Sequence, residues 1–158
     1  MMVVGTFLLS LLLYIDRACI SAAKDSIAES LNFSDKQMGW VLSIFALGYA
    51  LFQVPSGIAG DKYGPRKVLT VVVTLWSIFT AFTGLAWSYT SMLVVRFLFG
   101  AGEAGAFPNM ARAIYSWIPV KERGITQGIN FSGSRIGSAF ALPLVAWLIT
   151  AIGWRMSF

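Results

Sequence analysis

Five ionisable residues lie inside long apolar stretches of this sequence, one helical turn or more from either end: Asp16, Arg17, Arg96, Glu103 and Arg135. An ionised side chain at the centre of a bilayer costs at least about 2.5 to 3.5 kcal/mol, so such residues indicate function by default. With a helical rise of about 1.5 Å per residue, all but Arg96 lie at a similar depth, roughly 17 to 20 Å from the start of each predicted span. Arg96 lies about two turns before Glu103 and shares its helix face.

These charges could serve in two ways. Pairing of Arg17 with Glu103, or of Arg135 with Asp16, would lock the helices together, as buried ion pairs can. However, three arginines face two carboxylates, so one positive charge stays unbalanced even when both acids are ionised. A bound organic anion would neutralise that charge. The pattern therefore favours an anion-binding site over a purely structural cluster, with Arg96 as a supporting charge.

Proton-linked chemistry in this chain depends on carboxylates, because the sequence has no histidine. Removal from water favours the neutral acid, whereas a nearby arginine favours the carboxylate. Arginine itself stays charged. Asp16 and Glu103 could therefore change charge as water and substrate enter and leave, which is what coupling a proton to an anion requires. The polar residues expected near the same depth, as partners for substrate hydroxyls, are Tyr14, Tyr49, Gln53 and Ser134.

The composition indicates that membrane-spanning helices hold these residues. The 158 residues are 57% hydrophobic and 12% charged, with a mean hydropathy of +0.72, whereas a soluble domain is about 25% charged. A span needs roughly 20 residues. We expect an all-α polytopic bundle of about five spans with the start of a sixth after Gly153. The five spans are expected over residues 1–23, 38–60, 68–87, 92–114 and 125–152.

The segments between the apolar runs support this arrangement. Residues 24–37 are rich in charge and predict a water-exposed connection, and Ser34 with Gln37 has the capping-box spacing that places a helix start near Asp35. The span over 68–87 carries no charge and is typical of an ordinary lipid-facing helix. Tryptophans near predicted span ends, as expected of interfacial anchors, are Trp40, Trp87, Trp117 and Trp154.

The basic residues predict the orientation, because short cytoplasmic loops are enriched in Lys and Arg. The loops after the second and fourth spans hold five basic residues, and the opposite side holds three. We therefore expect these two loops and the N-terminus in the cytoplasm.

The run from Gly100 to Gly105 matches the G-x-G-x-x-G dinucleotide fingerprint letter for letter. That fingerprint has meaning only between a strand and a helix, and here it lies inside an apolar run. The glycines are better explained as a smooth surface for close contact between helices. The fifth span carries Gly-xxx-Gly pairs of its own, so we expect the fourth and fifth spans to pack tightly together. Prolines that predict kinks or local breaks are Pro55, Pro108 and Pro143.

The most specific signal follows the second span. Residues 57–67 read Gly-Ile-Ala-Gly-Asp-Lys-Tyr-Gly-Pro-Arg-Lys and resemble the signature G-x-x-x-D-[RK]-x-G-x-[RK]-[RK] of the major facilitator superfamily, which lies between that family's second and third helices. A generic basic turn explains the Lys and Arg but not the Gly and Asp spacing. The glycines permit a tight turn, and the acid can cap or pair with a neighbouring helix end and close one conformation. The expected gating residues are Gly57, Asp61, Lys62, Gly64, Arg66 and Lys67.

Within that superfamily, the sequence resembles the anion:cation symporters, which include bacterial galactonate, glucarate and hexuronate carriers and the vesicular glutamate and sialic acid carriers. The similar stretches are Tyr14-Ile-Asp-Arg-Ala, Gly48-Tyr-Ala-Leu-Phe-Gln-Val-Pro-Ser-Gly57, Arg96-Phe-Leu-Phe-Gly-Ala-Gly-Glu-Ala and Gly153-Trp-Arg. The resemblance covers essentially the whole chain.

This resemblance implies roles for the site residues. Arg17 is expected to contact the substrate carboxylate, and Asp16 and Glu103 are expected to be the protonation sites. Arg135 is expected to tune which anion is accepted. The remaining residues expected to line the pocket are Tyr14, Tyr49 and Gln53.

The sequence thus predicts a secondary active transporter of the inner membrane that carries a small organic anion, such as a hexuronate, galactonate or glucarate, in symport with protons. The superfamily pattern implies that residues 1–158 are the N-terminal half of a bundle whose C-terminal half is missing. Two alternatives are a carrier of a neutral sugar or drug, and a small non-transporting membrane partner protein. An enzyme is not expected, because the sequence has no histidine and a single cysteine. Neither cofactor, metal nor nucleic acid is expected as a partner.

Overall fold

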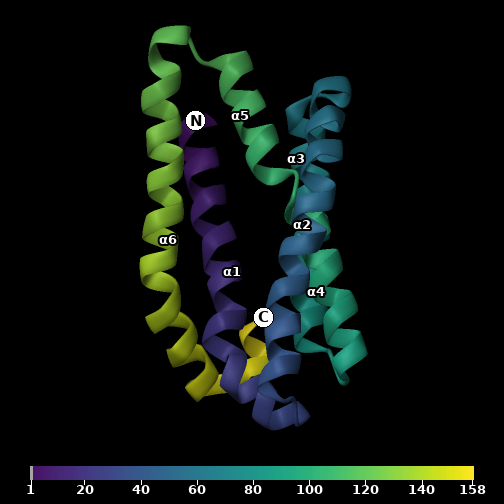
Figure 1. Cartoon of the computed structure of the whole chain (residues 1–158). Helices are drawn as coiled ribbons and strands as arrows, with labels where there is room; N and C mark the ends of the chain where they lie inside the picture. Colours follow the sequence, from purple (N-terminus) through teal and green to yellow (C-terminus); the bar gives the residue numbers. More distant parts are fainter. Residues whose placement is uncertain (1) are drawn as a thin grey trace.

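The computed structural model describes residues 2–158 as a bundle of helices (Figure 1). Two short helices, α4 and α5, lie end to end along the bundle and make one of its crossings. Four further crossings are made by helices long and apolar enough to span a membrane, which confirms the predicted all-α bundle. The elements are α1, Met2–Leu31; α2, Asp35–Tyr63; α3, Pro65–Gly84; α4, Tyr89–Glu103; α5, Ala106–Trp117; the 3-10 turn η1, Val120–Glu122; α6, Arg123–Ile152; and the 3-10 turn η2, Trp154–Ser157.

The crossing predicted as one helix over residues 92–114 is interrupted at residues 104–105, between α4 and α5. Pro108 explains the break, because it has no N–H and its ring collides with the carbonyl four residues earlier in a continuous helix. The side-chain amide of Asn109 joins the break to α2, because its Nδ2 donates to Gly105 O at 2.8 Å and to Ser56 O on α2 at 3.1 Å. The other two prolines, Pro55 and Pro143, lie inside the uninterrupted helices α2 and α6.

Helix α1 is longer than predicted. The segment 24–37, expected as a water-exposed connection, is helical as far as Leu31. The reason is that the apolar face of α1 continues for another turn, to Ile27, which is buried in a cluster shared with α2. The predicted capping box at the start of α2 is confirmed: Gln37 N donates to Ser34 Oγ at 3.4 Å, and Ser34 N donates to Gln37 Oε1 at 2.9 Å.

Glycines bring two pairs of helices into direct backbone contact. A Cβ atom at Gly48 of α2 would collide with a carbonyl of α4, and one at Gly100 of α4 would collide with a carbonyl of α2. Gly133 and Gly137 of α6 approach carbonyls of α1 in the same way. The expectation that the fourth and fifth spans pack tightly together is therefore wrong, because their glycine faces serve different partners: α4 packs on α2, and α6 packs on α1.

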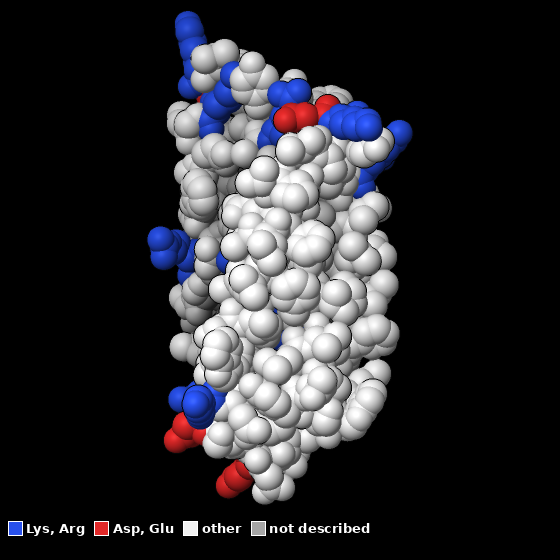
Figure 2. All heavy atoms as spheres, turned by 45° about the vertical axis from the view of Figure 1, so that its right-hand side comes forward, with Lys and Arg blue, Asp and Glu red and all other residues white. Residues whose placement is uncertain are grey.

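The two ends of the bundle carry most of its charge. Figure 2 shows Lys, Arg, Asp and Glu gathered at both ends, with a largely uncharged surface between them. Trp154, expected as an interfacial anchor, is buried instead. It lies in η2, which is fastened to the end of α3 because Arg155 Nη1 donates to Gly84 O at 2.9 Å and Ala86 O at 2.7 Å. The other three expected anchors are exposed near helix ends: Trp40, Trp87 and Trp117.

Replacing Gly100 with leucine should force α2 away from α4, because the new side chain has no room at the backbone contact. We expect the free energy of unfolding to fall by about 1 to 3 kcal/mol or more, measured as thermal unfolding in detergent by circular dichroism. Gly128→Leu on α6 is the matched control, since a Cβ there meets no atom within 4 Å. Equal stability of the two variants would contradict the role given to the α2–α4 contact.

Candidate functional site

An ion pair between α1 and α4 lies at the centre of the charge cluster. Arg17 Nε donates to Glu103 Oε1. The Glu103 side chain is completely buried, at 0% exposure, and that of Arg17 is 23% exposed. Of the two pairings considered from the sequence, Arg17 with Glu103 is present. The other, Arg135 with Asp16, is absent from residues 2–158.

Three aromatic rings surround the Arg17 guanidinium. Its central carbon lies 4.6 Å from the ring centroid of Tyr49 and 5.3 Å from the centroids of Tyr14 and Phe45. Aromatic faces attract cations, and a desolvated contact of this kind is worth up to about 2 kcal/mol. Tyr14 and Tyr49 thus lie beside Arg17. Phe45 goes unpredicted, although it precedes Tyr49 by one helical turn, the spacing at which side chains on a helix meet.

Arg96 is buried on the same helix as Glu103, with 2% exposure. Its guanidinium carbon lies 4.8 Å from the ring centroid of Phe99 and 5.1 Å from that of Phe45. The Phe45 ring therefore contacts both Arg17 and Arg96. Within the part of the chain that the structure describes, Arg96 forms no ion pair. It is a second cation of the cluster, held by aromatic rings.

Asp16 faces a different helix from its neighbour Arg17, because successive helical residues point about 100° apart. Its Oδ2 accepts a hydrogen bond from Trp76 Nε1 on α3. The expectation that α3 is an ordinary lipid-facing helix is wrong at this position, since Trp76 is buried. A sequence signal exists: tryptophan is usual near span ends, and Trp76 lies in the middle of its span.

Two residues expected at the site lie outside the cluster. Arg135 is exposed, because Gly133 and Gly137 face α1 and a residue two positions from each points away from that contact. Gln53 is exposed on α2, one turn beyond Tyr49. The charges that remain together are two arginines and two acids. The excess positive charge expected from the sequence is therefore absent from the cluster when both acids are ionised.

The cluster holds polar atoms that have no partner. The buried atoms Arg17 Nη2, Arg96 Nε and Glu103 Oε2 make no hydrogen bond, and neither does the buried hydroxyl of Ser134 on α6. Buried polar groups are normally hydrogen-bonded, and one left unpaired costs about 1 to 3 kcal/mol. Arg17 and Glu103 form one ion pair, in which the unpaired N–H donor is chemically suited to hold an anion and the unpaired carboxylate oxygen to accept a proton.

The signature after α2 forms the tight turn into α3. Gly64 has a φ of 87°, a backbone conformation that favours glycine. Pro65 then begins α3, where the missing N–H costs no hydrogen bond. Gly57, one turn earlier than Asp61, lies on the side of α2 that faces α5, and a Cβ there would lie 3.6 Å from Pro108 Cβ.

The acid of the signature pairs with the neighbouring helix α5, but at a residue in the middle of that helix and not at its end as expected. Arg112 Nε of α5 donates to Asp61 Oδ1 at 3.0 Å, which joins the end of α2 to α5. The signature alone does not identify Arg112 as the partner. Its basic residues, which form no ion pair within residues 2–158, are Lys62, Arg66 and Lys67.

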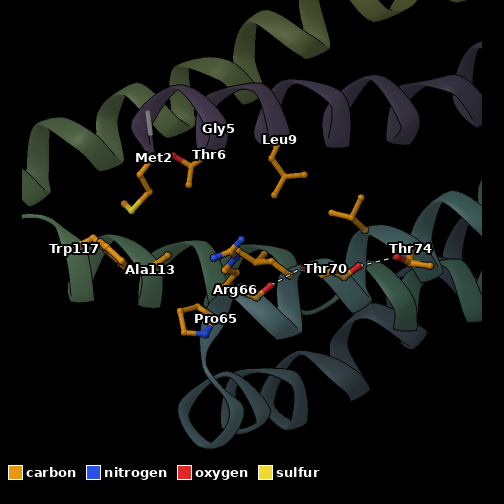
Figure 3. Close-up of a pocket in the computed structure, with 12 residues that line it drawn as sticks. Met2, Gly5, Thr6, Leu9, Pro65, Arg66, Thr70, Thr74, Ala113 and Trp117 are labelled. Carbon is orange, nitrogen blue, oxygen red and sulfur yellow. Dashed lines mark hydrogen bonds between the residues drawn. The ribbon is translucent and has the colours of Figure 1, made fainter.

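An open groove of about 940 Å³ lies between α1, α3 and α5, apart from the charge cluster. Figure 3 shows Met2, Thr6 and Leu9 of α1 on one side of it, and Arg66 and Ala113 on the other. Its lining is mainly apolar. The groove has the character of an unfilled helix-packing surface rather than of an anion site.

Comparison with curated proteins finds transporters of organic anions. The chain is 43% identical to the probable sulfoacetate transporter SauU of Cupriavidus necator, over 99% of this chain and 37% of that protein. It is 39% identical to the probable galactarate/D-glucarate transporter GarP of Escherichia coli, over 96% and 36%. It is 35% identical to the hexuronate transporter of Bacillus subtilis, again over 96% and 36%. The chain thus spans little more than a third of the length of these relatives.

The fold matches solved transporter structures. A bacterial homolog to the human lysosomal transporter Spinster, in an inward-facing and occupied conformation, superposes with a TM-score of 0.81 and 29% identity, over 97% of this chain and 37% of that chain. Together with four apolar helices able to span a membrane, these similarities make the chain a multi-pass protein of the cell membrane. Residues 6–158 match the Major Facilitator Superfamily profile, and the chain therefore belongs to that superfamily.

Proposed function

We propose that this chain is part of a secondary active transporter that carries a small organic anion, such as a sugar acid, across the inner membrane in symport with protons. The observation that carries the proposal is the buried Arg17–Glu103 ion pair, with unpaired N–H donors beside it. The relatives named as transporters of sulfoacetate, galactarate, D-glucarate and hexuronate support it, because each of these substrates carries a carboxylate.

Arg17 is the residue best placed to bind the substrate carboxylate. A guanidinium can present two parallel N–H groups to a carboxylate, and Arg17 Nη2 is free to take part. Arg96 adds a second cation to the same cluster. The phenols of Tyr14 and Tyr49 border Arg17 and supply hydroxyl groups for the rest of a sugar acid.

Protonation of Glu103 supplies the coupling. A neutral carboxylic acid no longer balances the charge of Arg17, so the cluster gains one positive charge, which an incoming carboxylate neutralises. Loss of the proton on the other side of the membrane restores the Glu103 carboxylate, which then competes with the substrate for Arg17 and displaces it. The helices rock around this central site, as alternating access requires.

We also infer that residues 1–158 form the N-terminal half of a two-half bundle. The chain spans about 37% of the length of the relative SauU. The last turn of this chain, η2, lies between α1 and α3. Cys19 Sγ of α1 donates to Ser157 O at 3.4 Å, and Arg155 is hydrogen-bonded to the end of α3. A helix that continued from this point would run back along the groove between α1 and α3, whose apolar lining suits it.

Contact with a second half would give a role to the two polar residues that lie outside the charge cluster. An exposed charge inside a span is costly against lipid, and both Arg135 and Gln53 are exposed in this chain. Contact with the second half would remove them from lipid and place them at the boundary of a site between the halves. In that arrangement Gln53 lines the pocket and Arg135 influences which anion is accepted, as the sequence leads us to expect.

Arg17→Ala should abolish uptake of carboxylated substrates. Truncating one partner of a buried charged pair costs about 2 to 5 kcal/mol, so uptake by the full-length protein in liposomes should fall at least about 30-fold. Lys36→Ala, at the exposed start of α2, is the control. Equal uptake of a sugar acid and the corresponding neutral sugar, unaffected by Arg17→Ala, would instead favour a carrier of neutral compounds.

Glu103→Gln should uncouple transport from protons while sparing substrate binding. The amide is similar in shape to the protonated acid, so Arg17 stays available to the substrate, but no proton can be bound or released. We expect substrate affinity within a few-fold of the wild type and no accumulation driven by a pH gradient. Normal proton-coupled accumulation in this variant would remove Glu103 from the mechanism.

Asp61→Asn should alter the transport rate more than the stability. The Asp61–Arg112 pair is largely exposed, and exposed pairs contribute at most about 1 kcal/mol to stability. If the pair closes one conformation, its loss changes how often the bundle opens at the end where α2 meets α5. Arg112→Gln should have the same effect. The charge swap Asp61→Arg with Arg112→Asp should recover part of the rate; two independent, additive losses would indicate that the pair has no gating role.

A further inference from the structure

Trp76 on α3 is hydrogen-bonded to Asp16 on α1. It is the α3 residue that contacts the charge cluster through a polar group. It is 4% exposed on α3, and its Nε1–H donates to Asp16 Oδ2. The indole N–H is a donor only, so it suits a carboxylate and cannot take a proton from one. No arginine within residues 2–158 forms an ion pair with Asp16, although Arg17 follows it directly. The hydrogen bond to Trp76 is therefore the contact that orients this carboxylate.

The backbone at Trp76 is also held against α4. A Cβ atom at Gly102 would lie 3.3 Å from Leu75 Cβ and 3.5 Å from Trp76 N. Helix α3 therefore runs in close contact with the residue just before Glu103. One rigid stretch of α3 thus touches Asp16 through a hydrogen bond and the end of α4 through packing, which links the two acids of the cluster.

We propose that Trp76 is a positioning residue for proton coupling: its indole N–H orients Asp16, favours the ionised carboxylate and so sets the pH range over which transport responds to protons. The inference rests on the proposed function, in which Asp16 is a proton site. A hydrogen bond to an ionised acceptor is stronger than one to a neutral acceptor. Removing the donor therefore makes Asp16 easier to protonate, and the transport response moves to higher pH.

Other ionisable groups also act on Asp16, and all of them remain when Trp76 alone is changed. A difference in pH response between the wild type and a Trp76 variant therefore reports on the indole. These groups are Cys19 on α1 and Arg96 and Glu103 on α4, and Arg17 is the next residue of α1.

The test compares Trp76→Phe with the wild type in the full-length protein. Trp76→Phe keeps an aromatic ring and removes the N–H. Trp147→Phe, at a 64% exposed position within α6, is the matched control. Uptake of labelled D-glucarate into liposomes is measured against external pH. We expect the pH midpoint in Trp76→Phe to lie about one unit above that of the wild type and the control, as loss of one hydrogen bond to a charged group predicts.

An unchanged midpoint in a Trp76→Phe protein that still takes up D-glucarate overturns the inference. If the wild type shows no pH-dependent uptake of D-glucarate or of the other anions that its relatives carry, the proposed function fails, and infrared titration of the purified proteins decides the role of Trp76. The carboxylic acid band of Asp16 is identified by its loss in Asp16→Asn. In Trp76→Phe that band should appear at higher pH than in the wild type, and its appearance at the same pH rejects the positioning role.

A second replacement guards against a folding defect in Trp76→Phe. Benzothienylalanine at position 76 keeps the shape of the indole and replaces its N–H with sulfur. It is measured in the same two assays. A shift of the same sign supports a hydrogen-bonding role, whereas wild-type behaviour shows that the ring acts through its shape alone.

Discussion

The Glu103 carboxylate is completely buried at the end of α4, and an ionised group in that position requires a partner. Arg17 supplies it from α1, and aromatic rings from α1 and α2 lie around the guanidinium. The pair thus requires three helices to meet at one level. Removing either partner would leave a buried charge uncompensated. The same dependence makes the pair responsive, because a proton on Glu103 or an anion on Arg17 changes its balance.

The ion pair crosses the boundary between two tightly packed units. Glycine contacts join α1 to α6 and α2 to α4, whereas α1 meets α2 through few contacts. The Arg17–Glu103 pair and the Trp76–Asp16 hydrogen bond both run from α1 across this boundary. Polar interactions therefore connect units that backbone packing leaves separate. Apolar clusters also cross this boundary, so a change of protonation at the two polar contacts acts on an interface that side-chain packing already holds.

The charge balance of the cluster changes the account of anion binding. With Arg135 outside, Arg17 and Arg96 are matched by Asp16 and Glu103. A neutral cluster is less costly in a membrane without substrate than one with a permanent positive charge. The positive charge that attracts an anion then arises when an acid is protonated. Binding of the proton therefore favours binding of the anion.

The apolar runs, the capping box at Ser34 and the spacing of the turn signature predicted the bundle and the turns that begin α2 and α3, because each depends on residues close together in the chain. The depth of Arg17 and Glu103 followed from helical rise alone. Tertiary structure decided which faces meet: it placed Arg135 outside, brought Phe45 and Trp76 to the charges, and paired Asp61 with Arg112. The rotation of each helix about its axis depends on glycine contacts with other helices, which no single helix's sequence specifies.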